Sequence, residues 1–400
     1  MGPKRRVLIY SHDSFGLGHL RRCMTLANRF VANHKGLSVL ILSGSPIIGS
    51  FNFRSRVDFV RIPGMIKLRN GAYTPLNLHI SPDDTLNLRR EIIYHTARAF
   101  DPDLFIVDKE PRGLRGEVSD TLEMLKARGT PLVLGLRDVL DDPALLAAEW
   151  ERKKAIPALA DLYDQIWIYG LREIYDPLTG IDVPDRVRRK LVYTGYLRRK
   201  LPRHRPQEKS EDLIGEPYIL VTPGGGGDGE ALVDWVLRAY ECEAGLPYPA
   251  LVVFGPFMAP RSRQKFMERI ERLDRVAAIT FDTGFESLLA RAKGVVAMGG
   301  YNTFCEILSF DRPALIVPRT VPRREQLIRA EQASKLNLVK LLADDGSHDP
   351  KAMARALHGL ARQPSPSSVS IPGLLDGLDI VDTLASDLLM KQVKPIRTVV

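Results

Sequence analysis

The sequence predicts an α/β protein with two domains, each built from a parallel sheet and helices, on the basis of three observations. The chain has 400 residues, which is too long for one ordinary core and suits two domains. Short apolar runs alternate with longer amphipathic stretches along the whole chain, as in repeated βαβ units. A polar, strongly cationic stretch with two prolines, residues 197–215, lies between the halves and indicates an interdomain linker.

The first half of the chain has the pattern of one Rossmann-like domain, which we expect over residues 1–197. Its apolar runs predict strands at Arg6–Tyr10, Ser38–Leu42, Asp58–Ile62, Leu104–Val107, Pro131–Leu136 and Gln165–Tyr169. The amphipathic stretches between these runs predict helices at His19–Asn33, Asp84–Phe100, Gly116–Arg128 and Pro143–Ala160.

The second half repeats this pattern, and we expect a second Rossmann-like domain over residues 216–372, after a basic linker at 198–215. The predicted strands are Tyr218–Thr222, Ala250–Phe254, Ala277–Phe281, Gly294–Ala297 and Ala314–Val317. The predicted helices are Gly229–Glu243, Pro260–Leu273, Asn302–Ser309 and Arg324–Lys335. Residues 373–392 predict a C-terminal helix that crosses back to the first domain. Because such sheets bind ligands at the carboxyl ends of their strands, we expect the domains to face each other across a cleft.

The composition is that of a globular protein, with 44% hydrophobic and 26% charged residues. The three cysteines, Cys23, Cys242 and Cys305, are widely separated and odd in number, so they indicate neither a disulfide framework nor a metal site. No apolar run approaches the ~18 residues that span a bilayer, and the start of the chain lacks a signal-peptide core. We therefore expect a cytoplasmic protein without a bound metal.

The formal net charge of +9 implies an anionic partner. Three classes of partner are anionic: nucleic acid, anionic lipid and phosphorylated substrates. The sequence lacks any RNA-binding signature of interleaved aromatic and basic residues, and any zinc-finger spacing, which argues against nucleic acid. The basic clusters at 186–190 and 198–200 predict a peripheral contact with an anionic membrane at its inner face. A solvated basic surface is the alternative explanation of these charges.

The first glycine-rich loop, "SHDSFGLGHL", joins a predicted strand to a predicted helix. A dinucleotide fingerprint needs a third glycine and an acidic residue at the end of the second strand, and both are missing. What remains is a helix N-terminus that favours an anion, with Gly16 and Gly18 in the turn and His19 in the first helical turn. His12 and Asp13 in the same loop are candidates for orienting a substrate. A capping role for His19 is the alternative to a chemical one.

The second glycine-rich loop, "VTPGGGGDGE", also joins a predicted strand to a predicted helix. A plain turn needs one or two glycines, so four in succession indicate a backbone that lies close to a ligand, and we expect a diphosphate. Asp228 and Gly229 stand where a P-loop has Lys-Ser or Lys-Thr, which excludes a Walker ATPase. The four consecutive glycines are Gly224, Gly225, Gly226 and Gly227.

A third motif, "MGGYNTFCE", ends a predicted strand, turns at Gly299 and Gly300 and opens a predicted helix that contains Asn302. Thr303 and Glu306 have the spacing of a capping box, which is one explanation of this pair. The capping box explains neither the glycine pair nor the second helix start at "PRREQ". Two adjacent helix N-termini with a carboxylate and nearby arginines form a site suited to a ribose diol and phosphates.

Taken together, these motifs resemble the donor-binding half of the GT-B glycosyltransferases, in particular the N-acetylglucosaminyltransferase of peptidoglycan synthesis. The shared features are the glycine pair, the x-x-T-x-x-E helix, a strand that ends in proline and a Q-x-x-x-A helix. The first loop, with Arg22-Cys23 and Leu26-Ala27, resembles the same family and equally a nucleotide-sugar hydrolase of nonulosonate synthesis. The resemblance follows both domains in order, but residues 40–215 contain no closely matching motif.

The resemblance implies a role for each matching residue of the second domain. Glu306 would hold the ribose hydroxyls, the glycine-rich loop would wrap the diphosphate, and the backbone around Phe281 would contact the base. Gln326, with Glu325 beside it, would contact hydroxyls of the donor sugar. Glu325 and Arg329 differ from the residues common at these positions, which leaves the identity of the sugar open.

The resemblance also implies the reaction, with His19 as the base. The expected protein is a metal-independent glycosyltransferase whose co-substrate is a nucleotide-diphosphate sugar, with a UDP-sugar favoured and no other cofactor. The acceptor would be a sugar, a lipid-linked molecule or a small molecule, and Arg137 and Asp138 at the end of a strand are candidates for touching it. The alternatives are a nucleotide-sugar hydrolase of the same fold and a non-catalytic sugar-nucleotide-binding protein.

Overall fold

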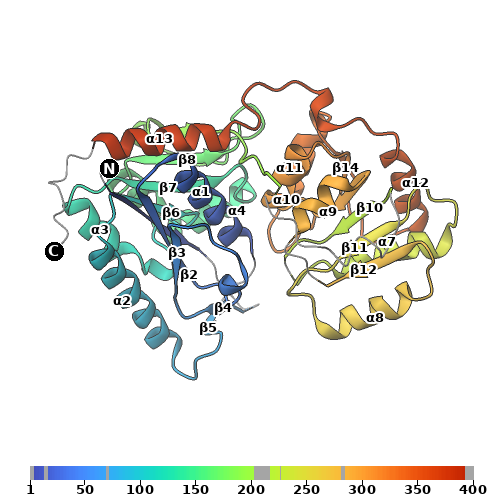
Figure 1. Cartoon of the computed structure of the whole chain (residues 1–400), viewed down its shortest axis with the longest axis horizontal. Helices are drawn as coiled ribbons and strands as arrows, with labels where there is room; N and C mark the ends of the chain where they lie inside the picture. The colour runs from blue at the N-terminus through green and yellow to red at the C-terminus, as the bar shows by residue number, and fades with distance from the viewer. Residues whose placement is uncertain are drawn as a thin grey trace. The chain divides into compact units, whose positions relative to one another are not determined.

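The computed structural model describes residues 4–12, 17–68, 72–201, 217–225, 227–280 and 284–391. These residues divide into two compact units (Figure 1). Unit 1 combines the described residues up to Leu197 with those from Asp376 onward, and unit 2 runs from Arg198 to Leu375. Each unit contains its own parallel sheet with helices, so the predicted fold of two Rossmann-like domains is confirmed.

The sheet of unit 1 has seven strands in the order β3-β2-β1-β6-β7-β8-β9. All neighbouring pairs are parallel. Strands β1 and β6 are almost wholly buried, which explains why they are continuous apolar runs rather than alternating ones. The strands are β1 Arg5–Ser11, β2 Leu37–Ser43, β3 Val57–Arg61, β6 Leu104–Asp108, β7 Leu132–Arg137, β8 Gln165–Tyr169 and β9 Leu191–Tyr193.

The helices of unit 1 are α1 Gly18–Asn33, α2 Pro82–Phe100, α3 Ser119–Ala127, α4 Pro143–Arg152, α5 Ala155–Asp161 and α6 Asp185–Arg188. A small antiparallel pair, β4 Met65–Lys67 and β5 Tyr73–Pro75, precedes α2. The prediction of one helix over 143–160 is wrong, because Lys154 adopts a left-handed conformation with φ of 49° and separates α4 from α5.

The sheet of unit 2 has six strands in the order β12-β11-β10-β13-β14-β15, all parallel. The strands are β10 Ile219–Thr222, β11 Ala250–Val253, β12 Val276–Ile279, β13 Gly294–Ala297, β14 Ala314–Ile316 and β15 Lys340–Leu341. The helices are α7 Glu230–Cys242, α8 Pro260–Ile270, α9 Phe285–Arg291, α10 Tyr301–Ser309, α11 Glu325–Lys335 and α12 Pro350–Leu360. Helices α9 and α12 and the two-residue strand β15 were not predicted from the sequence.

The last helix, α13 Gly377–Lys391, belongs to unit 1 and packs on α1 (Figure 1). Asp382 accepts hydrogen bonds from Asn33 and His34 at 2.5 and 2.9 Å, and Arg29 pairs with Asp379. The predicted return of the C-terminal helix to the first domain is therefore confirmed.

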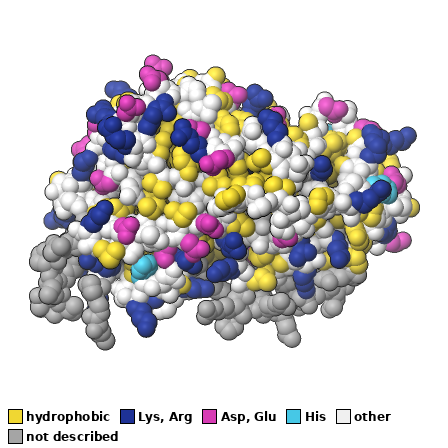
Figure 2. Space-filling model, turned by 90° about the horizontal axis from the view of Figure 1, so that it is seen from above, with side chains coloured by type: hydrophobic (Ala, Val, Ile, Leu, Met, Phe, Trp, Pro, Cys, Tyr) yellow, Lys and Arg dark blue, Asp and Glu magenta, His cyan; other side chains and the backbone are white. Residues whose placement is uncertain are grey.

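Some residues of the two basic clusters make hydrogen bonds within their own unit. Arg199 is 8% exposed and donates to Asn302 at 2.6 Å, so the first residues of the expected linker pack on unit 2. Lys190 donates to the carbonyls of Leu159 and Ala160 at 3.1 and 2.5 Å. On the face shown in Figure 2, lysine and arginine side chains are interspersed with acidic ones. None of the described helices is long and apolar enough to cross a membrane.

Candidate active site

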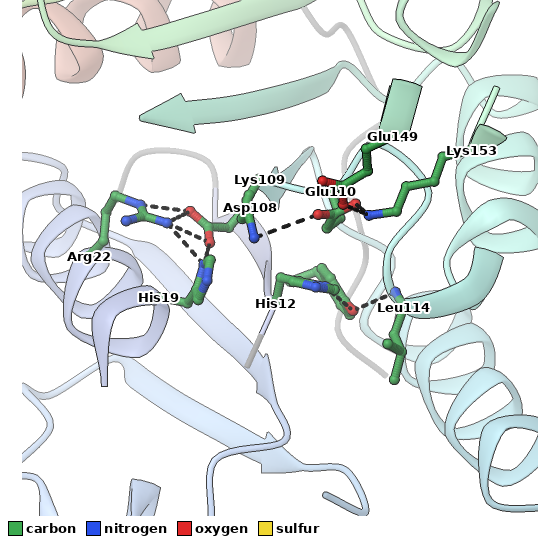
Figure 3. Close-up of polar contacts among 10 residues, drawn as sticks. His12, His19, Arg22, Asp108, Lys109, Glu110, Leu114, Glu149 and Lys153 are labelled. Atoms are coloured by element: carbon green, nitrogen blue, oxygen red, sulfur yellow. Dashed lines mark hydrogen bonds and ion pairs between the residues drawn. The ribbon is translucent and has the colours of Figure 1, made fainter. Parts of the chain in front are cut away.

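The carboxyl edge of the unit 1 sheet brings His19, Arg22 and Asp108 together (Figure 3). Tyr10 of β1 is in register with Val107 of β6, so the turn after β1 and the end of β6 meet at the same edge. His19 lies in the first turn of α1, and Nδ1 of its ring contacts Oδ2 of Asp108. Arg22, three residues further along α1, donates from Nε and Nη2 to the two oxygens of Asp108 at 2.7 and 2.8 Å.

The protonation states of this cluster follow from its burial and charges. Burial opposes ionisation of Asp108, but the Arg22 guanidinium and His19 beside it hold the pKa of that carboxyl well below its usual range. Burial lowers the pKa of His19, and this effect outweighs the nearby Asp108, which acts in the opposite direction. His19 is therefore neutral at pH 7.

The tautomer of His19 follows from its contact with Asp108. An ionised carboxylate only accepts hydrogen bonds, so the proton of the neutral ring lies on Nδ1 and is donated to Asp108. Nη2 of Arg22 donates to the shared carboxylate at 2.8 Å and also lies 3.0 Å from Nδ1, a contact between two donors once Nδ1 carries the proton. The lone pair of His19 is then on Nε2. With 20% of its side chain exposed, His19 can meet a ligand and accept a proton.

His12 lies next to this cluster (Figure 3). The rings of His12 and His19 have centroids 5.8 Å apart and planes at 85°. Nδ1 of His12 is 3.3 Å from the hydroxyl of Tyr10. Both candidate histidines of the first loop therefore lie in one site, whereas Asp13 and Gly16 fall outside the described residues and Gly18 opens α1.

A second ionic cluster adjoins the histidines. Glu110 accepts from Lys153 at 2.7 Å and lies 3.6 Å from the ammonium of Lys109, and Lys153 also donates to Glu149 at 2.6 Å (Figure 3). Burial opposes ionisation of Glu110, but these cations and His12 hold its pKa well below the usual range. Lys109 has a φ of 68°, a conformation that non-glycine residues adopt infrequently and that often marks functional turns.

The two candidates at the end of β7 have structural contacts in unit 1. Asp138 is 1% exposed, and its carboxylate accepts from the hydroxyl of Tyr196 at 3.0 Å and from the amide of Val139 at 2.8 Å. Arg137 is the last residue of β7 and is half-buried. The role of this pair in acceptor binding stays a prediction.

In unit 2, one arginine links the glycine-rich loop to the start of α11. Arg319 pairs with Asp228, which ends the loop, and with Glu325 at 2.8 Å. The amide of Arg319 donates to the side chain of Gln326 at 3.2 Å. The structure thus brings together Gln326, Glu325 and the loop of Gly224, Gly225 and Gly227, whereas Gly226 and Phe281 fall outside the described residues.

The turn after β13 needs glycine at its first position. Gly299 has a φ of 80°, and a Cβ there would lie 2.7 Å from Ile316, whereas Gly300 has open space around it. The nearby carboxylate of Glu306 is completely buried. Arg329, also buried, donates to the carbonyl of Gly299 at 3.0 Å and so ties α11 to this turn.

The capping-box interpretation of Thr303 and Glu306 is wrong. The residue that precedes α10 is Gly300, which places Thr303 at the third helical position, and no side chain caps the helix. Both residues are therefore inside α10, where Asn302 accepts from Arg199 at 2.6 Å.

The sequence analysis missed Asp108, the partner of His19. An available signal was its position, since it is the acidic residue that ends the buried run "LFIVD". In a parallel sheet a polar residue at that point lies at the ligand-binding edge. Its identity as the partner of His19 could not be inferred, because 89 positions separate the two residues.

The comparisons with known proteins agree on the fold. No family model matches the chain. A protein of Methanosarcina mazei described as an uncharacterized glycosyltransferase is 24% identical over 332 residues, which cover 76% of this chain and 77% of that protein. Among solved structures, TcCGT1 in complex with UDP superposes with a TM-score of 0.67 at 13% identity, covering 97% of this chain and 100% of that one.

Two further solved structures extend this likeness. MurG of Acinetobacter baumannii has a TM-score of 0.58 at 11% identity and covers 98% of this chain and 100% of its own. The glycosyltransferase VinC in complex with dTDP has a TM-score of 0.62 at 16% identity, and the alignment covers 96% of this chain and 98% of VinC. The chain therefore has the GT-B fold of these glycosyltransferases over nearly its whole length.

Proposed function

We propose that this protein is a glycosyltransferase that moves a sugar from a nucleoside-diphosphate donor to an acceptor hydroxyl, with His19 as the base. The observation that carries the proposal is the cluster of His19, Asp108 and Arg22, since it makes a neutral histidine with a lone pair on Nε2. The M. mazei relative described as a glycosyltransferase and the similarity to TcCGT1, solved with UDP, support the same reaction class.

In the proposed reaction, Nε2 of His19 takes the proton of the acceptor hydroxyl as its oxygen attacks the anomeric carbon. The bond between that carbon and the diphosphate oxygen breaks, and the nucleoside diphosphate leaves with the bonding electrons. Asp108 stabilises the imidazolium that forms, because its Oδ2 already faces Nδ1. Arg22 keeps Asp108 ionised for this task.

We propose that unit 2 binds the donor. Helix N-termini and turns rich in glycine present amide groups that suit phosphate oxygens, and this supports a diphosphate site at Gly224–Gly227 and Gly299–Gly300. Glu306 is our candidate for the ribose hydroxyls, and Arg319 holds the loop beside α11 through its pairs with Asp228 and Glu325. Charge stabilisation by the helix N-termini and the amides of the glycine turns would serve in place of a metal ion.

The reaction is tested with purified protein, UDP-glucose, UDP-N-acetylglucosamine and dTDP-glucose, and with saccharide, lipid-linked and phenolic acceptors. Slow release of nucleotide that an acceptor accelerates, with a glycosylated product in the mass spectrum, is expected. Rapid release of free sugar without any acceptor would instead establish a nucleotide-sugar hydrolase. Binding of nucleotide without turnover of any donor would establish a sugar-nucleotide-binding protein.

The donor site is tested by calorimetry with UDP. Replacing Glu306 by Ala should weaken binding by roughly 1.5–3 kcal/mol, the range for hydrogen bonds to charged groups. Glu268→Ala on the exposed face of α8 is the matched control and should leave the affinity unchanged. Equal affinities in both variants would remove Glu306 from the donor site.

A further inference from the structure

A hydrogen-bonded chain of buried side chains leads from Arg89 through Glu117 and Tyr10 to His12. Tyr10, Arg89 and Glu117 are each at most 1% exposed. Arg89 donates from Nε and Nη2 to the two oxygens of Glu117, both at 2.6 Å, and the hydroxyl of Tyr10 is 2.5 Å from Oε1 of Glu117. The amide of Leu114 donates to the hydroxyl oxygen of Tyr10 at 3.2 Å. The last member of the chain is Nδ1 of His12, 3.3 Å from that oxygen.

The direction of each hydrogen bond in this chain is determined by its chemistry. The guanidinium of Arg89 only donates, so both oxygens of Glu117 are acceptors. Tyr10 therefore gives its single proton to Glu117, and its hydroxyl oxygen can only accept from its other neighbours. Burial raises the pKa of Tyr10 well above its usual value, so that proton stays in place.

His12 must then donate through Nδ1. A neutral imidazole carries one proton, so a donor at Nδ1 leaves the lone pair on Nε2. Burial lowers the pKa of His12 well below its usual value, an effect that outweighs the nearby carboxylate of Glu110 and is assisted by Lys109, His19 and Lys153. His12 is thus neutral, in the same tautomer as His19.

The two neighbouring rings each keep an acceptor lone pair on Nε2. Both rings make their hydrogen bonds to described residues through Nδ1. Their centroids are 5.8 Å apart, and each Nε2 would accept a hydroxyl proton over about 2.8 Å. Adjacent hydroxyls of a sugar ring or polyol can meet acceptors on two neighbouring rings, whereas a single alcohol or phenol can meet only one.

We propose that His12 is a second acceptor-binding imidazole, and that the acceptor is a saccharide or polyol with two neighbouring hydroxyls. This inference rests on the proposed glycosyl transfer. Nε2 of His12 accepts a hydrogen bond from the hydroxyl beside the reacting one, while His19 takes the proton of the reacting hydroxyl. No bond to His12 forms or breaks. Tyr10, Glu117 and Arg89 are positioning residues, which fix the tautomer of His12 from behind.

The first test measures the tautomer and needs no turnover. Long-range proton–nitrogen spectra of the ¹⁵N-labelled protein distinguish a histidine protonated on Nδ1 from one protonated on Nε2. We expect His12 on Nδ1 in the wild type and a mixture of tautomers in Tyr10→Phe, which removes the hydroxyl and keeps the ring. A wild-type His12 protonated on Nε2 would overturn the inference.

The second test measures binding of cis-1,2-cyclohexanediol and of cyclohexanol through the Nε2 resonances of His12 and His19. The diol should shift both histidines and bind more tightly than the monool. His12→Phe should lower that preference by roughly two- to tenfold, the effect of one hydrogen bond, and His12→Gln, which keeps an acceptor atom, should retain part of it. His95→Phe at an exposed position of α2 is the control and should change nothing.

The outcomes separate this inference from the proposed function. Equal binding of diol and monool to the wild type, or an unchanged preference in His12→Phe, overturns the role of His12 whatever the enzyme assay shows. Diol binding that depends on His12 in a protein without transfer activity supports the diol site and refutes the reaction instead.

Discussion

The two units have the same type of parallel sheet but place different chemistry at its carboxyl edge. In unit 1 that edge carries paired ionisable side chains, such as the buried pair of Asp108 with Arg22 and the pair of buried Glu110 with the exposed Lys153. In unit 2 it carries glycine turns at Gly224 and Gly299, with Arg319 bridging two carboxylates. One fold thus presents side chains in one copy and backbone in the other.

The difference shows how each kind of site is held in place. A side chain that moves a proton needs a fixed tautomer and a fixed pKa, and buried partners from distant strands and helices supply both. A backbone that binds an anion needs only its own conformation, which glycine permits locally. We therefore expect substitutions at the edge of unit 1 to act through charge, and those in unit 2 to act through space and φ.

The largest expected effect is on turnover, from the base in unit 1. His19→Ala should lower kcat by about 10²–10⁴, the usual contribution of a positioned base, because the group that takes the acceptor proton is removed. UDP affinity should stay unchanged, since the proposed donor residues belong to unit 2. Steady-state kinetics and calorimetry on this variant, with His95→Ala as control, measure both. Full activity in His19→Ala would mean that His19 is not the base, which would then be sought at His12 or Asp13.

The next effect compares one substitution, arginine to methionine, in the two units. Arg89→Met leaves the carboxylate of Glu117 buried without its guanidinium and should lower the free energy of unfolding by about 3–5 kcal/mol. Arg269→Met in unit 2 breaks ion pairs whose side chains are 27–37% exposed and should cost about 0.2–1 kcal/mol. Denaturant unfolding measures both. Similar losses would contradict the expected dependence on buried charge in unit 1.

Two adjacent glycines test the backbone site of unit 2. Gly299→Ala forces a left-handed conformation on alanine and pushes its Cβ against Ile316, so it should lose about 1–2 kcal/mol of stability from the conformation alone. Gly300 has a φ of −57°, and a Cβ there would meet no other atom, so Gly300→Ala should keep the stability of the wild type. If the turn lies against the diphosphate, Gly300→Ala should nevertheless weaken UDP binding. Unfolding curves and calorimetry on the pair decide this.

The last comparison concerns a pH dependence of stability that unit 1 should dominate. Burial lowers the pKa of His12 and His19 in the folded state, so below about pH 6.5 the unfolded chain binds protons that the folded chain does not. The free energy of unfolding should therefore fall as the pH drops, by about 1.4 kcal/mol per pH unit for each histidine. The free energy of unfolding, measured by denaturant curves between pH 7 and 5, should change less with pH in His12→Phe than in the wild type. The same pH dependence in both proteins would contradict the lowered pKa of His12.

The sequence predicted elements well where the signal was local. Strand β8 has the predicted bounds because Gln165–Tyr169 is a buried run between polar segments. Helix α12 was missed although its start has a visible signal, Asp349 followed by proline, and Asp349 caps Lys351 and Ala352. The break at Lys154 was missed although Pro157 follows three positions later, and a proline there cannot donate to the carbonyl of Lys153 as a continuous helix would require. Propensity alone could not predict a left-handed lysine between two helices.

The sequence by itself determined the two α/β units, the glycine turns and the presence of histidines at the start of α1. These follow from apolar periodicity, from turn residues and from motif spacing, all of which act over a few positions. Only the tertiary structure decided that Asp108 meets His19, that Arg22 keeps that carboxylate ionised, and that Tyr10 faces His12. The reason is physical: the pairing of β1 with β6 sets which side chains share the buried edge, and burial then sets their pKa values and tautomers.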